Sequence, residues 1–187
     1  MERCRRLVVL AVTLSLPVLA EEPAKAGAPP RPKPNPALVE AFKDAAGTWA
    51  CTGTMENPQS PGTQLKTKSE MKITSEVDGF SYSGHYHVEK NAAMPGGMKA
   101  ALHWGWDDSK GKLVEAGFDS MGSTWSGTSE GMKGDTTVWA EEGTMMGQPT
   151  KSRTTVTKKG AKELTVLFEV DNKGAWQKMG EDHCKKR

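Results

Sequence analysis

The sequence predicts an all-β fold, an antiparallel up-and-down barrel of about ten strands that follows a short N-terminal helix. Three observations support this fold class. Apolar and polar residues alternate with a period of two from Thr48 onward, as in half-buried strands. Turn sequences with Gly, Asn and Asp recur about every 8–12 residues. The 20 glycines and the hydrophobic content of 36% fit short strands joined by many turns better than a helical bundle.

A meander of this length has two open edges unless the first and last strands pair. Closure into a barrel removes both edges and the aggregation hazard that they carry. A sandwich of two sheets is the alternative arrangement of the same strands.

The first twenty residues have the features of a secretory signal. A basic start is followed by an apolar run and a small-residue end at Val18-Leu19-Ala20. The alternative is a membrane anchor, but the run is short for a span and Pro17 interrupts it. We therefore predict cleavage after Ala20, export to the periplasm or the outside of the cell, and no membrane span in the mature chain.

Removal of residues 1–20 changes the charge of the protein. It takes away three of the 25 basic residues and one of the 23 acidic residues, so each class falls to 22 and the net charge becomes zero. A neutral chain without a basic cluster lacks the electrostatic features of nucleic-acid or anionic-membrane binding. We expect neither kind of partner, and no oligomeric state follows from the sequence.

Residues 21–36 form the next zone, and they contain six prolines and no large apolar side chain. Such a segment has nothing to bury, so we predict a disordered tether with extended stretches. A spacer through an envelope is the functional alternative. The remainder, 37–187, is long enough for one domain with its own core.

A short helix is expected at the start of this domain. Asn35 suits the N-cap and Pro36 the first turn. Leu38 and Phe42 then share a face with Ala45 at helical spacing, which places them against one end of the barrel. We predict roughly ten residues of helix that end at Gly47 in a left-handed conformation.

Strands are expected wherever the period of two continues between turns. The clearest alternate apolar residues with lysines, as in 65–73, or with histidines, as in 80–88. The expected strands are 48–55, 65–73, 80–88, 98–106, 113–118, 123–129, 136–145, 150–158, 163–170 and 175–182.

The mature chain keeps two of the three cysteines, Cys51 and Cys184. In an oxidising compartment two cysteines favour one disulfide. It would close a loop that spans most of the mature chain, with a stabilisation on the order of 4–5 kcal/mol. Two buried free thiols are the alternative.

Several motifs resemble known families. The triplet Gly47-x-Trp49 after a short helix resembles the opening of the calycin superfamily, which includes lipocalins and fatty-acid-binding proteins. A larger set resembles a bacterial family of exported proteins called domain of unknown function fifteen-seventy-nine, over roughly residues 38–186. Its motifs are Gly47-Thr48-Trp49-x-Cys51-x-Gly53, Trp104-Gly105-Trp106-Asp107, Gly131-x-x-Gly134-Asp135 with Val138-Trp139, Met145-Met146-Gly147-Gln148 and Gly180-Glu181-Asp182-His183-Cys184.

This resemblance implies a calycin-like, lipocalin-like barrel and a disulfide between Cys51 and Cys184. The family has no agreed biochemical role. The chain departs from it at Trp106, where the family pattern predicts tyrosine; an aromatic exchange leaves the predicted fold unchanged.

The aromatic residues are the candidates for a ligand site. Aromatic side chains that line the mouth of a barrel suit a flat or apolar ligand, although small barrels are often filled by their own side chains. We expect Trp49 to close one end of the barrel as a structural residue, together with Cys51 and Cys184. The expected ligand-binding residues are Tyr82, Tyr86, Trp104, Trp106, Trp125 and Trp139.

Histidines are the candidates for a metal or haem site. His85 and His87 share a strand face, and His103 is a possible third ligand. That face also carries serines opposite the aromatic face, so we expect it to be solvated and to bind no metal. Nitrobindin-like barrels bind haem through a late histidine, but His183 abuts Cys184 at the rim, so we expect no cofactor.

Catalytic motifs are absent from the sequence. It contains no nucleophile elbow, phosphate loop, dinucleotide fingerprint or zinc-protease motif. We therefore predict an exported protein that binds a small hydrophobic or aromatic ligand without catalysis. A protein-interaction or structural module of the envelope is the alternative, and an enzyme with its site in the barrel mouth is the third hypothesis.

Overall fold

The structure is a computed structural model that describes residues 31–57, 60 and 62–187. The predicted signal and residues 21–30 of the predicted tether lie outside the described residues. Residues Lys33–Arg187 form one compact unit that contains one α-helix, one 3-10 turn and eleven strands. They are α1 (Pro36–Phe42), β1 (Gly47–Glu56), β2 (Gln64–Glu76), η1 (Val77–Gly79), β3 (Ser81–Val88), β4 (Met98–Asp107), β5 (Lys112–Asp119), β6 (Thr124–Ser129), β7 (Met132–Lys133), β8 (Thr136–Met145), β9 (Gln148–Lys158), β10 (Glu163–Asn172) and β11 (Ala175–Lys186).

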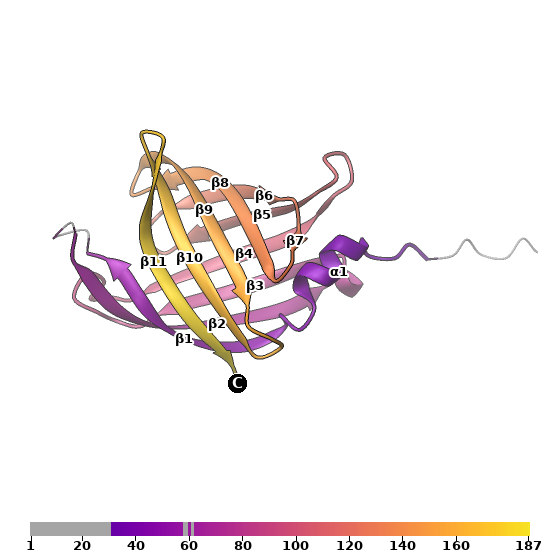
Figure 1. Cartoon of the computed structure of the whole chain (residues 1–187), viewed down its shortest axis with the longest axis horizontal. Helices are drawn as coiled ribbons and strands as arrows, with labels where there is room; N and C mark the ends of the chain where they lie inside the picture. Colours follow the sequence, from indigo (N-terminus) through magenta and orange to yellow (C-terminus); the bar gives the residue numbers. More distant parts are fainter. Residues whose placement is uncertain (1–30, 58–59, 61) are drawn as a thin grey trace, which may run out of the picture. The chain divides into compact units, whose positions relative to one another are not determined.

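The strands form a closed antiparallel barrel, which confirms the predicted fold class. Neighbours in the sequence pair with one another, β6 pairs with β8, and β1 pairs with β11. Ten strands thus complete the ring, and the two-residue β7 is an extra strand beside β8 (Figure 1). Closure excludes the sandwich, because every long strand has a partner on both sides.

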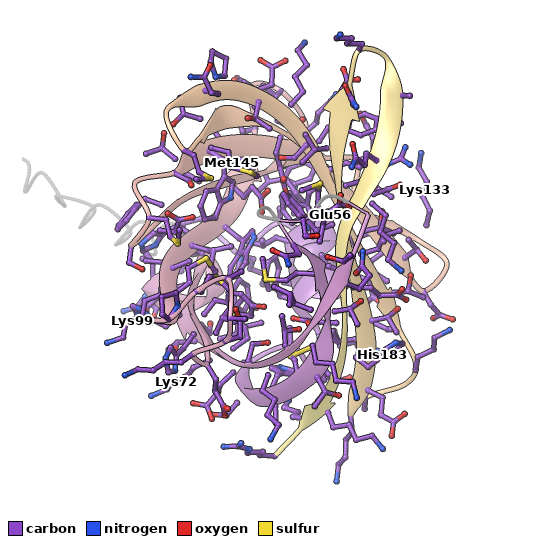
Figure 2. The ribbon with its side chains drawn as sticks, turned by 90° about the vertical axis from the view of Figure 1, so that its left-hand side faces the viewer. Glu56, Lys72, Lys99, Lys133, Met145 and His183 are labelled. Atoms are coloured by element: carbon purple, nitrogen blue, oxygen red, sulfur yellow. A yellow bond between two sulfur atoms is a disulfide. The ribbon has the colours of Figure 1, made fainter. Side chains whose placement is uncertain are left out.

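The period of two decides which side chains face the interior. On β3, Tyr82 is buried whereas His85 and His87 are exposed. On β2, Lys72 alternates with the half-buried Met71, and it points away from the ring of strands, as does Lys99 on β4 (Figure 2). The aromatic face is therefore the inner face, and the charged face is the outer one.

Helix α1 covers one end of the barrel (Figure 1). The Asn35 side chain accepts a hydrogen bond of 2.9 Å from the Ala37 amide and so caps the helix, as predicted. The predicted length was wrong, because the helix has seven residues and ends at Phe42. The chain turns there through Asp44, which has a φ of 61°, and Gly47 is the first residue of β1.

The strand bounds agree with the predicted ranges to within a few residues at most ends. The largest difference is β11, which continues through Cys184 to Lys186. The C-terminal part of β11 pairs with β1, from Lys186 opposite Trp49 to Gly180 opposite Met55. This pairing supplies the partner that the exposed edge of β1 needs, so closure extends the strand. Among the described residues no helix is both long and apolar enough to span a membrane.

Candidate functional site in the barrel interior

The end of the barrel beneath α1 is filled by apolar side chains. Leu38 and Leu113 have no exposed surface. The Phe42 ring stacks on Tyr82 with 4.4 Å between the ring centres, and its centre lies 5.3 Å from that of Trp104. Helix α1 therefore acts as a lid whose apolar face completes this part of the core.

The six residues predicted to bind a ligand all face the interior, in three environments. Tyr82, Trp104 and Trp139 are buried in the packed cluster beneath α1, and Trp106 is half-buried against it. Trp125 is half-buried on β6, and its ring lies over the position where Gly117 lacks a side chain. The remaining residue, Tyr86, belongs to a polar group that the sequence analysis did not predict.

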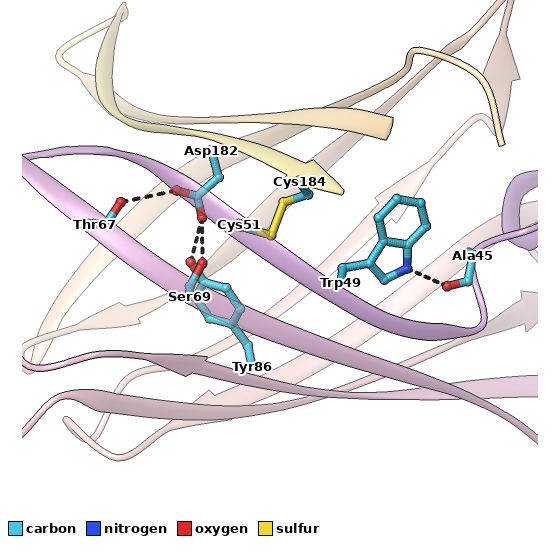
Figure 3. The surroundings of a disulfide bond; sticks show 8 residues. All are labelled: Ala45, Trp49, Cys51, Thr67, Ser69, Tyr86, Asp182 and Cys184. Carbon is cyan, nitrogen blue, oxygen red and sulfur yellow. Dashed lines mark hydrogen bonds between the residues drawn. A yellow bond between two sulfur atoms is a disulfide. The ribbon is translucent and has the colours of Figure 1, made fainter. Parts of the chain in front are cut away.

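The disulfide between Cys51 and Cys184 is present, as predicted. The two residues are direct partners on β1 and β11, with 4.0 Å between their Cα atoms, and both are buried. Trp49 packs in the same cluster, and its indole N–H donates a 2.7 Å hydrogen bond to the Ala45 carbonyl (Figure 3). This bond ties the start of β1 to the segment that follows α1.

Asp182 is the centre of a polar group inside the barrel wall. Its carboxylate accepts hydrogen bonds from the hydroxyls of Thr67, Ser69 and Tyr86, at 3.2, 3.1 and 2.8 Å (Figure 3). The side chain reaches β2 and β3 from β11 because it crosses β1 at Gly53, where a Cβ would collide with the carboxylate. Three donors around one anion form a network of charge-assisted bonds.

The phenol of Tyr86 responds to this environment. Burial raises the pKa of Tyr86 far above its usual value, and the negative charge of Asp182 raises it further. The phenol therefore stays neutral and continues to donate its proton to Asp182 over the physiological range.

A second polar group runs across the opposite part of the wall. Its members, which we call the carboxyl row, are successive cross-strand partners on β4, β5, β6, β8 and β9. In order they are Trp104, Glu115, Gly127, Glu141 and Ser152. Glu115 and Glu141 thus flank a glycine, and both are buried.

One oxygen of each of the two carboxyl groups accepts a hydrogen bond from a neighbouring side chain. The Trp104 indole donates to Glu115 Oε2 at 2.9 Å, and the Ser152 hydroxyl donates to Glu141 Oε2 at 2.6 Å. A Cβ at Gly127 would lie 2.9 Å from Glu115 Oε1 and 3.0 Å from Glu141 Cγ, so the glycine leaves the space that these groups occupy. Burial raises the pKa of Glu115 well above its usual value, and the charge of Glu141 adds to this effect.

The third part of the interior is an apolar wall on β9 and β10. Its β10 residues pair with residues of β11 that include Asp182 and Cys184, and its β9 residue Val156 pairs with β10, yet all of them remain half-buried rather than buried. We call this set the apolar wall: Val156, Leu164, Val166, Phe168 and Val170. These inward-facing side chains keep some accessible surface, as do their outward neighbours on β10, and Leu164 and Val166 pack against the cluster of Trp49, Cys51 and Cys184.

The histidines lie on the outer face. His85, His87, His103 and His183 are exposed, and in Figure 2 His183 points away from the ring of strands. Within residues 31–57, 60 and 62–187 no group of three His, Cys, Asp or Glu side chains is placed to hold a metal ion. His183 instead lines two surface depressions of about 310 and 610 Å³, whose other walls are mostly polar and charged.

Three interior carboxyl residues were missed by the sequence analysis, although a signal for each was present. Asp182 lies two residues before Cys184, so an inward disulfide places it inward as well. Glu115 is in phase with the apolar Leu113, and Glu141 with Trp139. The period of two therefore identifies all three once one inward residue per strand is known.

Neither a protein-family model nor a curated protein matches the sequence. Solved structures do match: the crystal structure of Rv2717c from M. tuberculosis has 12% identity and a TM-score of 0.60, over 83% of this chain and 99% of that one. The S-type phycobiliprotein lyase CPES from Guillardia theta has 10% identity and a TM-score of 0.46, over 79% of this chain and 91% of that one. At these identities the likeness concerns the fold alone. The fold is a closed antiparallel barrel, as the strand pairing shows, and the calycin-like assignment and membership of the family named above stay predictions.

Proposed function

We propose that this protein binds a small ligand with an apolar body in the interior of its barrel. The observation that carries the proposal is the apolar wall, whose inward-facing side chains remain half-buried although the end beneath α1 is fully packed. Apolar surface that stays accessible inside a closed barrel gains free energy when an apolar ligand covers it. In this proposal the ligand takes the place of water against the apolar wall.

The predicted aromatic residues keep a role in this proposal. Tyr82, Trp104, Trp106 and Trp139 form the packed floor of the site, and the half-buried Trp125 contributes to its side. Tyr86 acts through Asp182 and fixes the polar group beside the apolar wall. A site with a large apolar surface and a few convergent polar groups is typical of small-molecule binding.

Export belongs to the same proposal. The predicted signal lies outside the described residues, but the buried disulfide supports an oxidising compartment, because cytosolic thiols are kept reduced. We infer that the protein binds its ligand in the periplasm or outside the cell, as members of the family that it resembles are exported.

The test is binding of N-phenyl-1-naphthylamine, a neutral apolar probe that fluoresces when it leaves water. Two variants on β10 form a matched pair: Val166→Trp fills the interior, whereas Leu167→Trp places the same ring on the outer face. We expect saturable fluorescence with the wild type and with Leu167→Trp, and at least a tenfold weaker response with Val166→Trp. Circular dichroism checks that both variants fold, since an added ring in a core destabilises by about 1–3 kcal/mol.

Two results would overturn the proposal. One is the absence of saturable probe binding to the wild type. The other is equal loss of binding in both folded variants, which would place the probe elsewhere on the protein.

A further inference from the structure

The carboxyl row contains a close pair of buried carboxyl groups, Glu115 and Glu141. When both are ionised, Glu115 Oε1 is a buried side-chain atom with no hydrogen-bond partner among the described residues, in a residue that is only 7% exposed; a proton on Glu115 allows a hydrogen bond to Glu141. The other oxygen of this carboxyl group is held by the Trp104 indole, so the free oxygen is aimed past Gly127 toward Glu141. A buried carboxylate oxygen without a donor is unfavourable, and either a proton or a bound donor removes this penalty.

The charges around the row define the kind of donor that it accepts. No basic side chain of the described segments forms an ion pair with Glu115 or Glu141. Two lysines near the covered end of the barrel donate to backbone carbonyls instead. Lys158 donates to the carbonyls of Glu40 and Lys43. Lys186 donates to the carbonyl of Asp44. The interior therefore carries acidic groups without a resident cation to balance them.

We propose that Glu115 and Glu141 bind a basic nitrogen of the ligand, so that the ligand is an amphipathic amine whose apolar body covers the apolar wall. This inference rests on the proposed function and specifies its ligand class. An ammonium group supplies the N–H donors and the positive charge that the ionised pair lacks.

The position of Glu115 beside Glu141 also affects whether the Glu115 carboxyl group carries a proton. In the free protein the raised pKa of Glu115, caused by burial and by the charge of Glu141, favours a proton on this carboxyl group. The facing groups on the adjacent strands are Trp104, Gly127 and Ser152, and none of them titrates in the neutral range. When an ammonium group binds, the proton leaves Glu115 for solvent, and the carboxylate that remains accepts the ammonium N–H. Binding therefore releases a proton.

The test uses three probes of one shape, namely 1-naphthylmethylamine, 1-naphthalenemethanol and 1-naphthoic acid, measured by calorimetry at neutral pH. The wild type should bind the amine at least tenfold more tightly than the alcohol, and the acid most weakly. Glu115→Gln and Glu141→Gln should each reduce the preference for the amine at least fivefold. Glu142→Gln is the matched control, because Glu142 is the exposed outer neighbour of Glu141, and it should leave the preference unchanged.

A second measurement separates recognition from a structural role. Calorimetry in buffers of different ionisation enthalpy should show proton release when the amine binds to the wild type and none with Glu115→Gln. Equal binding of amine and alcohol to the wild type, with N-phenyl-1-naphthylamine still bound, would overturn this inference and leave the proposed function in place. Failure of all four probes to bind would overturn both.

Discussion

Small residues at single positions decide how the larger side chains of this barrel are placed. Asp182 reaches the hydroxyls of β2 and β3 only because Gly53 leaves a gap in β1. The Trp125 ring lies over Gly117 in the same way. A glycine in a strand weakens the strand itself, so its presence marks a close approach of a neighbouring group.

The hydrogen bond between Tyr86 and Asp182 can be tested by a single substitution. Tyr86→Phe removes a hydrogen bond of 2.8 Å to the Asp182 carboxylate, and we expect a loss of about 1.5–3 kcal/mol of unfolding free energy, as for hydrogen bonds to charged groups. The pKa of Tyr86 is raised in the folded state by burial and by Asp182, whereas an unfolded phenol ionises near pH ~10. The stabilisation is therefore complete below pH ~10 and is lost as the pH rises from there toward the folded pKa.

Ultraviolet titration of tyrosinate checks this prediction directly, because the chain has only two tyrosines. Alkaline titration of the folded wild type should show a late component that is absent from Tyr86→Phe. A variant with the same late component as the wild type would contradict the assignment.

At the scale of elements, helix α1 is too short to be stable alone, and its two buried side chains explain why it forms. An isolated helix of seven residues lacks the length for cooperative stability in water. Leu38 and Phe42 supply the missing free energy because they enter the apolar cluster at the end of the barrel. The Asn35 cap fixes where the helix begins.

We expect Leu38→Ala to lower the free energy of unfolding by about 2–5 kcal/mol, as in other fully buried leucine sites. Its neighbour Val39 is 47% exposed, so Val39→Ala serves as the control and should change stability little. Urea unfolding followed by tryptophan fluorescence measures both values. Equal effects of the two substitutions would show that α1 does not complete the core.

At the scale of the whole molecule, the pairing of β1 with β11 closes the ring. The other pairs join strands that are neighbours in the sequence or, for β6 and β8, nearly so. The seam instead joins residues separated by 133 positions at the disulfide. Long-range pairs form only after a large loss of chain entropy, and a covalent link at the seam reduces that loss.

The double substitution Cys51→Ala and Cys184→Ala removes this link. We expect a decrease in unfolding free energy on the order of 4–5 kcal/mol, measured by urea denaturation under oxidising conditions. Reductant should destabilise the wild type to a similar extent and leave the double variant unchanged. Identical unfolding curves for the oxidised wild type and the double variant would contradict a stabilising role for the seam disulfide.

Local features of this protein follow from short stretches of its sequence. Alternation of residue types is a property of each strand, so the strand positions, the Asn35 cap and the exposed histidine face of β3 were all predictable. The disulfide was predictable because two cysteines remain after the predicted cleavage. The helix end was not predicted, because Lys43 leaves the helical conformation with a ψ of 126° and Asp44 takes a positive φ of 61°, so the helix stops before Gly47.

Only the tertiary structure decided which residues meet inside the barrel. Glu115 and Glu141 approach one another because β6 lies between β5 and β8 and contributes Gly127 between them. Asp182 meets Tyr86 because β11 closes onto β1. Register between strands sets these contacts, and register depends on closure of the whole ring rather than on any single segment.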